Sequence, residues 1–381
     1  MQANSTTETK RLPAPEMVRE LADLEGTCVT VYLAGHKGGS GSRPMRVRLH
    51  ALLAEAERLL ESRGVLPTDR QTLLDPLRAQ CEEPELNSGH ADSIAYFRNA
   101  RKLEQLNLPW EVEDMLSVEG VPMLTPLVHG MRSNRNFFLL AVSKKNTRLF
   151  ECGSSTQRMV EMPPGAPKAL EEFAGFDAPQ QTLGQTGGGA TYSMDTYAEK
   201  ERKHLHDFCR ALDRSLQPLL EQRGLPLVLA GATVELACYR EVNRYAQLAP
   251  HAVEGSPDAG ATDAELAARG RVALKSFRPA DELHAVDLFL RAGTGKKSSE
   301  IEEILRASAA GRVMHLFLSG EGVQTGDVDR ILDRVLPSGA PRGKQDNLAN
   351  AAAVETLRHG GAVWWLDEPL EQSSAAAVFR W

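Results

Sequence analysis

The longest amphipathic pattern in the chain lies between residues 182 and 220. Apolar side chains recur there every three or four residues, which is the spacing of one buried helical face. These residues are Leu205, Phe208, Leu212, Leu216 and Leu219. Thr196 and Glu199 fit a capping box, so we expect the helix to begin at Thr196. Pro218 has no amide donor and is expected to end or kink the helix.

Basic side chains occupy the rest of the surface of this predicted helix. They are Lys200, Arg202, Lys203, His206 and Arg210. Two interpretations stay open, a solvated face and a face that contacts RNA. The preceding loop carries Gly187, Gly188 and Gly189 at its tip, with Gln185 just before them. Glycine has little backbone preference, so the tip suits insertion into a partner.

Alternating strand patterns surround this helix and predict a hairpin before it. Residues 136–142 form an apolar run, 143–146 a polar turn and 147–152 the returning strand. Residues 153–190 are rich in Pro, Gly and Gln, and are expected to form a long irregular connection. Lys144, Lys145 and Arg148 at the hairpin tip are candidate RNA contacts, with a solvated hairpin end as the alternative. A buried strand at 226–232 and a helical or mixed piece at 235–243 follow.

The pattern of the N-terminal part, residues 1–131, predicts an α/β domain. After a leader at 1–12 that we expect to be disordered, we expect helices and strands at 15–24, 28–33, 47–62, 93–97 and 122–127. A glycine loop at 35–43 precedes the second helix, and loop amides at a helix start favour anions. Phosphate contacts are therefore candidates, against a plain solvated loop, at Lys37, Arg43, Arg46 and Arg48. The loop lacks the spacing of a nucleotide-binding P-loop.

A Gly- and Pro-containing stretch at 254–260 indicates a domain boundary, so we divide the chain at 1–131, 132–258 and 259–381. The last part is expected to form an α/β sandwich. Its predicted helices are 263–276, 280–292, 299–309 and 347–359, and its strands 312–318, 362–366 and 376–379. Residues 293–298 resemble a P-loop only superficially and are interpreted as a linker. Residues 321–346 are interpreted as a flexible insertion. The predicted class is α/β (α+β), with mixed sheets packed against helices in three domains.

Composition narrows the functional classes. The 381 residues are 42% hydrophobic and 25% charged, which is typical of a globular protein. Five cysteines without a C-x-x-C pair favour reduced, mostly buried thiols in a cytoplasmic protein. No apolar run is long enough to span a bilayer, and the start shows no signal region. The net charge of −7, with 15 basic and 15 acidic residues in 132–258, means that any RNA contact must come from local clusters.

Catalytic and cofactor motifs are missing from the sequence. We find no G-x-S-x-G, H-E-x-x-H or Rossmann pattern. His204 and His206 are two residues apart on the predicted helix and therefore point in different directions. We predict no metal site, no cofactor and no catalytic residue.

The order of a strand hairpin, a long linker, a glycine loop and a helix reading A-x-E-K-E-R-K-H resembles a known family. It resembles the middle domain of archaeo-eukaryotic class-one release factors and Pelota-type rescue factors. The nearest group is their bacterial homologues, the baeRF group, and the chain is family three-like. The strand at 28–33, the S-I-A-Y-F strand at 93–97 and PLVLAG after the long helix extend the resemblance to the whole chain.

The resemblance implies a function as well as a fold. In release factors, a glutamine follows two glycines and helps position the water that cleaves peptidyl-tRNA. Gly189 occupies that position here, and Gln185 precedes the glycines, so we expect no peptide release. No Asn-Ile-Lys-Ser loop for codon reading occurs in residues 1–130. The implied role is a non-enzymatic one, occupying the ribosomal A site in rescue, stress or hibernation.

The resemblance also implies partners. The basic loops would contact rRNA, and the C-terminal domain, of the kink-turn-binding ribosomal protein type, would engage a partner protein or the ribosomal stalk base. Two rival hypotheses stay open. One is an RNA hydrolase that uses the glycine loops and the histidines. The other is an RNA- or protein-binding module that has left the ribosome.

Overall fold

The computed structural model describes residues 15–35, 44–83, 93–154, 156–173, 190–320, 324–333 and 345–381, with the backbone alone at 15, 190–198 and 200. The chain divides into two compact units. The split unit combines the described residues up to Asn134 with Asp281–Trp381, and the middle unit is Arg135–Ala280. The expected boundary at residue 258 differs from the end of the middle unit, because the helix after it packs into the middle core.

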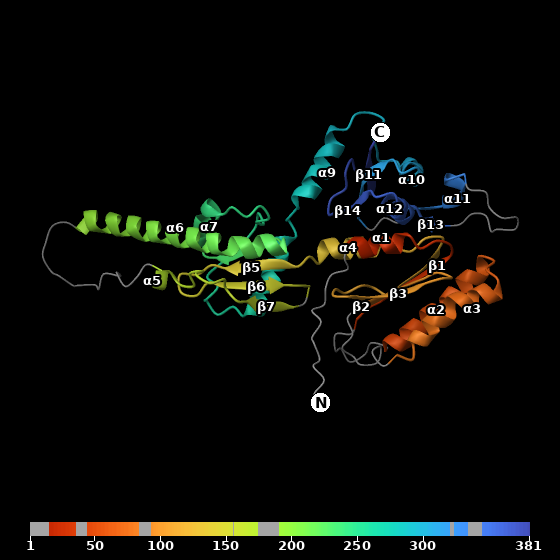
Figure 1. Ribbon diagram of the computed structural model, residues 1–381, viewed down its shortest axis with the longest axis horizontal. Coiled ribbons are helices and arrows are strands. Elements are labelled where there is room, and N and C mark those ends of the chain that lie inside the picture. Colours follow the sequence, from red (N-terminus) through yellow and green to blue (C-terminus); the bar gives the residue numbers. More distant parts are fainter. Residues whose placement is uncertain are drawn as a thin grey trace. The chain divides into compact units, whose positions relative to one another are not determined.

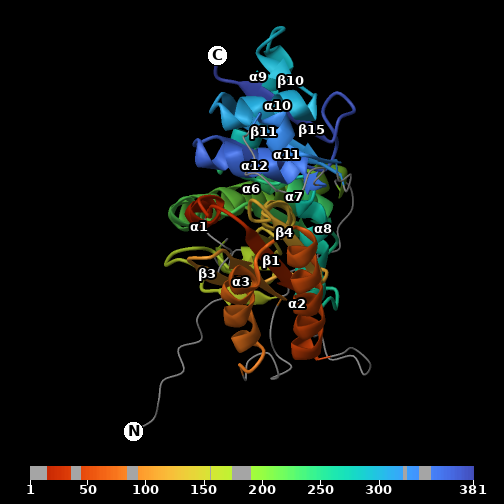
Figure 2. The same cartoon turned by 90° about the vertical axis from the view of Figure 1, so that its right-hand side faces the viewer.

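The first half of the split unit is a four-stranded antiparallel sheet with helices on both faces. The strand order is β3 (Leu103–Leu108), β2 (Ser93–Arg98), β1 (Cys28–Leu33) and β4 (Met115–Glu119). Alternate residues of β1 point to opposite faces. Val29, Val31 and Leu33 pack under α2 (Met45–Ser62) and α3 (Pro67–Gln80) (Figure 2), whereas Cys28 and Tyr32 join the core on the other face. That second core also contains α1 (Pro15–Ala22) and α4 (Thr125–Ser133).

The second half of the split unit is a four-stranded mixed sheet. Its order is β10 (Lys297–Ser298), β15 (Ala375–Phe379), β11 (Val313–Ser319) and β14 (Ala362–Leu366), with β11 and β14 parallel. One face packs on α10 (Ile301–Ala309) and α12 (Leu348–Arg358), and the other on α9 (Ala280–Arg291). Short elements lie between β11 and α12, namely β12 (Thr325–Gly326), α11 (Val328–Ile331) and β13 (Asp346–Asn347).

Helix α12 joins the two halves of the split unit. The buried Asn350 amide donates to the Pro122 carbonyl at 2.9 Å and accepts from the Leu124 amide at 2.7 Å. Arg358 donates to the carbonyls of Ala22 and Leu24. A buried polar group needs its hydrogen-bond partners, so these contacts specify how the C-terminal segment packs on the N-terminal one.

The middle unit is a five-stranded sheet between two helical layers (Figure 1). The strand order is β7 (Gln157–Val160), β6 (Arg148–Cys152), β5 (Phe137–Ala141), β8 (Leu227–Gly231) and β9 (Val253–Glu254). Phe138 and Leu140 face α6 (Ala190–Arg223) and α7 (Thr233–Val242), whereas Phe137 and Leu139 face α8 (Asp263–Leu274). The short helix α5 (Leu170–Phe173) packs against α6.

Most predicted elements are present, including β1, β5, β8 and β14, and the mixed α/β class is confirmed. The strand expected at 122–127 is wrong, because α4 begins at Thr125 with a proline in its first turn, a favourable helix position. Helix α6 begins at Ala190, six residues before the expected cap, since neither Gly nor Pro interrupts that stretch. It also continues past Pro218.

Other segments contain more regular structure than the sequence predicted. The connection at 153–190 contains β7 and α5, and the linker at 293–298 ends in β10. The pattern did not predict α3, β3 or β4. Parts of the expected insertion at 321–346 form β12, α11 and the start of β13, while 321–323 and 334–344 lie outside the described residues. The leader expected at 1–12 lies outside them as well.

Candidate nucleic-acid interface

The turn between β5 and β6 lies beside α6 and is held there by backbone and side-chain contacts. The Lys144 ammonium forms an ion pair with Glu201 of α6 at 2.8 Å. The Lys144 carbonyl accepts from the Leu170 amide at 2.8 Å, and the Thr147 amide donates to the Lys168 carbonyl at 2.7 Å. Leu170 is buried in the α6 core. The hairpin tip, the segment before α5 and the first half of α6 therefore form one edge of the middle unit.

Two basic residues of the predicted set are exposed beside this edge on α6. Arg202 and Lys203 directly follow Glu201, the partner of Lys144, and both are exposed. Lys145 is exposed at the hairpin tip, and His206 is half-buried. Leu205 and Phe208 of the same helix are buried, so the apolar stripe that the sequence predicted fixes which face of α6 is presented to solvent. We call Lys144, Lys145, Arg202 and Lys203 the basic edge.

Arg148 does not belong to the basic edge, contrary to the sequence-based expectation. Its guanidinium forms an ion pair with Asp263 at 2.7 Å and donates to the Pro257 carbonyl at 3.2 Å. It also lies over the Phe150 ring, 5.6 Å from its centre. The side chain is only 17% exposed. Arg148 therefore fastens β6 to the start of α8, and its charge is already balanced within the protein.

The basic residues predicted around the N-terminal glycine loop also include one that is exposed and one that is paired within the protein. Arg46 is exposed near the start of α2. Arg48 forms an ion pair with Asp114 at 2.6 Å and donates to the Ala34 carbonyl at 2.7 Å, so it ties α2 to the end of β1. Lys37 and Arg43 lie outside the described residues. Among the described residues of this predicted phosphate site, Arg46 is therefore exposed and Arg48 has partners within the protein.

The glycine tip itself, Gly187, Gly188 and Gly189, lies outside the described residues, as does Gln185. Lys200 is described by its backbone alone, within α6. His204 is exposed on α6, and His206 is half-buried. Within the described ranges, no group of three His, Cys, Asp or Glu side chains is arranged to hold a metal ion.

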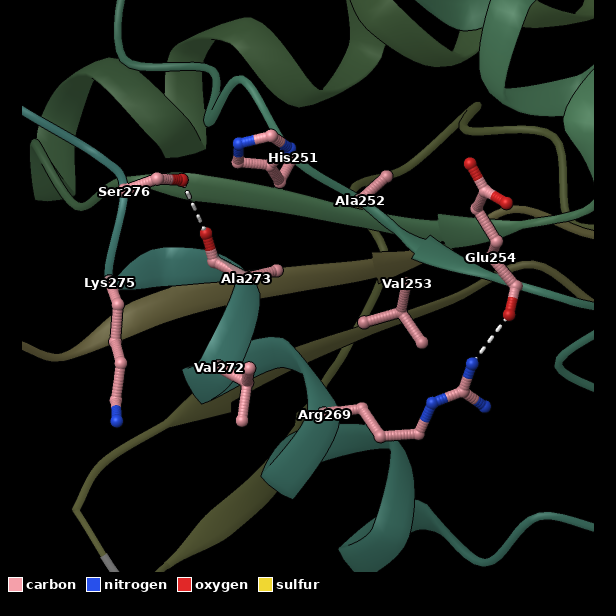
Figure 3. A pocket seen from close by; sticks show the side chains of 9 residues that line it. All are labelled: His251, Ala252, Val253, Glu254, Arg269, Val272, Ala273, Lys275 and Ser276. Carbon is pink, nitrogen blue, oxygen red and sulfur yellow. Dashed lines mark hydrogen bonds between the residues drawn. The ribbon is translucent and has the colours of Figure 1, made fainter.

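Sequence reasoning missed a pocket on the other side of the middle sheet. It lies between β9 and α8 and has a volume of about 520 Å³. Its lining combines alanine and valine side chains with the polar or charged residues His251, Glu254, Arg269, Lys275 and Ser276 (Figure 3). Arg269 donates from one guanidinium nitrogen to the Glu254 carbonyl at 2.5 Å, which links α8 to the edge strand β9. Its residues come from two segments that carry no recognisable motif, so no sequence signal marks it. Helix α6, which carries Arg202 and Lys203, covers the opposite face of the sheet.

Two further predictions from composition concern the cysteines and membrane-spanning segments. All five cysteines are free and buried, and burial raises the pKa of Cys152 to about 12 and that of Cys28 to about 12. Among the helices described, none combines the length and apolar character needed to cross a bilayer.

Comparison with known proteins finds a family model that matches part of the chain. Residues 136–312 match the family described as bacterial archaeo-eukaryotic release factor family 3. No curated protein matches the chain. Among solved structures, the archaeal translation termination factor aRF1 is 12% identical, with 98% of this chain and 100% of that chain covered and a TM-score of 0.25.

Two further solved structures give similar values. Dom34 of S. cerevisiae, a translation termination-like factor, is 11% identical, with 78% and 75% of the two chains covered and a TM-score of 0.34. Pelota of Archaeoglobus fulgidus is 13% identical, with 76% and 79% covered and a TM-score of 0.31. These superpositions are weak, so the informative similarity is the family match, which runs from β5 to the residue before β11. Residues 136–312 of this chain are thus similar to bacterial archaeo-eukaryotic release factor family 3.

Proposed function

We propose that this protein is a ribosome-associated translation factor that occupies the A site without reading a codon or hydrolysing peptidyl-tRNA, in rescue, stress or hibernation. The observation that carries the proposal is the family match, which spans the described core of the middle unit, α6 included. A release factor family is defined by work on the ribosome, and a ribosome offers a dense phosphate surface to any local basic cluster.

The basic edge supports ribosome contact despite the acidic chain. The net charge of −7 disfavours binding driven by a global field. Arg202, Lys203 and Lys145 are nevertheless exposed along one edge of the middle unit, and Lys144 is held beside them by its ion pair. Such a cluster gives modest affinity that falls steeply with salt, because each phosphate contact releases bound cations.

The first experiment measures sedimentation of the full chain with 70S ribosomes at low and at high salt. We expect pelleting at low salt and its loss at high salt. Arg202→Glu combined with Lys203→Glu should weaken binding at least tenfold. Arg214→Glu is the matched control, since Arg214 is also exposed on α6 but lies about 18 Å further along the helix. No pelleting at either salt would refute the proposal and favour a module that works away from the ribosome.

The proposed lack of hydrolysis rests on residue chemistry at position 189. Glycine has no side chain with which to orient a water, whereas the glutamine of a releasing loop has one. Ribosomes loaded with peptidyl-tRNA should therefore keep their peptide when the purified protein is added. Release of peptide at a rate above that of ribosomes alone would disprove this part, while leaving ribosome binding untouched. RNA that stays intact in the same mixture would exclude the rival RNA hydrolase.

We propose further that the C-terminal half of the split unit binds a partner protein. Support comes from the sequence resemblance of this segment to the C-terminal domain of the family. Binding to ribosomes stripped of stalk proteins would distinguish this contact from that of the basic edge. Binding through rRNA alone should persist after stripping, whereas binding through a stalk protein should be lost.

A further inference from the structure

The pocket between β9 and α8 lies beside an open edge of the middle sheet. Among the described strands, β9 pairs with β8 alone and ends the sheet. Arg269, Val272, Ala273 and Ser276 recur every three or four residues, so they share one face of α8, and this face lines the pocket (Figure 3). A strand edge and a helix face therefore form two walls of the same pocket.

The backbone of this edge offers hydrogen-bonding groups on its open side. The Gly255 amide donates to the Gly231 carbonyl of β8 at 3.0 Å. Because successive residues of a strand direct their backbone groups to opposite edges, Ala252 and Glu254 direct theirs away from β8. The Glu254 carbonyl accepts from Arg269. Among the described residues, the Glu254 amide and both backbone groups of Ala252 have no such partner. A strand from another chain can complete an edge of this kind.

The side chains around the pocket favour a ligand that combines apolar and acidic groups. Val253 is buried, whereas Val272 is 67% exposed, so the pocket keeps an apolar surface that a ligand can cover. Three basic side chains are also exposed there, namely His251, Arg269 and Lys275. Glu254 is the one acidic residue of the lining. The pocket is therefore cationic around an apolar centre, and carboxylates on a ligand would complement it.

We propose that the edge of β9 binds a short, extended, acidic peptide segment of a partner protein by strand addition. The peptide backbone pairs with the open backbone groups of Ala252 and Glu254. Alternate side chains of the peptide share one face and lie roughly 7 Å apart. An aliphatic side chain on that face enters the pocket against Val272, and acidic side chains on either side of it pair with Lys275 and Arg269.

Two features restrict what can pair with this edge. β9 has only two residues, and Pro250, which has no amide donor, lies just before it. Arg269 already occupies the Glu254 carbonyl. Short edges that carry proline and charged side chains resist open-ended pairing between copies of one chain. A short segment of a different protein therefore fits this edge better than a second copy does.

The test measures binding of a fluorescein-labelled peptide, Ser-Glu-Thr-Ile-Thr-Glu-Ser, to the full-length protein by fluorescence anisotropy. The isoleucine and both glutamates of this probe lie on one face of an extended strand. We expect saturable binding that weakens as salt is added. The same peptide with lysine in place of each glutamate should not bind. Failure of the glutamate peptide to bind, or equal binding of the two peptides, would overturn the proposal.

Methylation of the peptide backbone tests whether the peptide pairs as a strand. Two versions of the probe carry N-methyl groups on alternate amides, one version for each edge of the extended peptide. Only one edge can face β9, so one version should lose binding while the other keeps it. Equal binding of the two versions would exclude strand addition.

Variants at exposed positions locate the peptide on the protein without disturbing the core. Val272→Asp should weaken binding about tenfold, because it places a carboxylate in the apolar contact and repels the peptide. Val234→Asp is the matched control, since Val234 is 63% exposed on α7 of the same unit. Lys275→Glu should weaken binding of the glutamate peptide and strengthen that of the lysine peptide. Equal effects of Val272→Asp and Val234→Asp would contradict the site.

Two further measurements test other occupants of the edge. Sedimentation equilibrium of the free protein would reveal a dimer, and a dimer that Val272→Asp dissociates would assign the edge to a second copy instead. Displacement of the peptide by polyuridylate would assign the pocket to nucleic acid. Sedimentation with 70S ribosomes should be the same for Val272→Asp and the wild type, so this proposal can fail while the proposed function stands.

Discussion

Individual side chains show how strongly their surroundings decide what a charged residue does. Glu119 lies at the end of β4, where burial raises the pKa of its carboxyl group to about 7. The neighbouring carboxylate of Asp346 raises it further, while the Asn347 amide, Arg63 and Ser117 oppose the shift. Arg63 is itself paired with Asp346 at 3.3 Å. The Glu119 carboxyl, at the junction of β4 and β13, is therefore partly protonated at neutral pH, unlike an ordinary glutamate.

This proton makes the stability of the protein depend on pH. The folded carboxyl has a higher pKa than the unfolded one, whose value is near 4.5. Between about pH 4.5 and 7 the folded state holds more protons, so the free energy of unfolding falls as pH rises. Glu119→Gln should remove this dependence and stabilise the protein at pH 8 by on the order of 2 kcal/mol. Urea unfolding at pH 5 and pH 8 measures it, and the exposed Glu113→Gln serves as control.

Helix α4 packs so closely on Trp110 that one position tolerates only glycine. A β-carbon at Gly130 would lie 2.2 Å from the indole nitrogen of this buried ring. Gly130→Ala should therefore destabilise the split unit by about 3 kcal/mol, because a packed core resists added volume. Thermal unfolding checks it. Gly120→Ala meets nothing within 4 Å and should leave the melting temperature within a degree or two. Equal effects of the two would contradict the packing argument.

At the scale of whole elements, Pro218 is the unexpected feature of α6. The residue is exposed, and the helix continues on either side of it. Proline cannot donate to the carbonyl one turn earlier, so it weakens a helix interior. Pro218→Ala should raise the free energy of unfolding of the middle unit by about 1 kcal/mol or more. Chemical denaturation monitored by far-UV circular dichroism measures this. A loss of stability would instead mean that the surrounding core requires the proline ring.

Sequence patterns predicted elements far better than they predicted the site. The alternation in β1 and the buried runs of β5 and β8 are local signals, and the apolar stripe of α6 is long enough to be unambiguous. Helix α3 escaped prediction because its apolar residues are few and Pro76 interrupts it. The sequence could not show that Arg148 and Arg48 form internal ion pairs whereas Arg202 and Lys203 are exposed, because all four carry the same charge. The distinction depends on Asp263 and Asp114, acidic partners that are 115 and 66 residues away and come close only in the fold.

At the scale of the molecule, the split unit depends on contacts between the two ends of the chain. Asn350 is fully buried, donates to the Pro122 carbonyl and accepts from the Leu124 amide. Asn350→Ala would leave these backbone groups unpaired, so the split unit should lose about 2–4 kcal/mol. Hydrogen exchange should accelerate in α1, α4 and α12, with little change in β5, β6 and β8. Equal acceleration in the middle strands would show that the two units unfold together.

The chain leaves the split unit after Asn134 and returns to it at Asp281, and the two passages meet where Arg132 contacts the buried Glu282 at 3.2 Å. During synthesis, the intervening 146 residues emerge as one contiguous stretch and can fold before the C-terminal partner strands have been made. Once these residues have folded, their two ends lie close together. The N-terminal and C-terminal segments of the split unit can then pair with a smaller loss of chain entropy than if a long unfolded loop joined them. The order of synthesis thus favours the assembly of the split unit, whose two halves are far apart in the sequence.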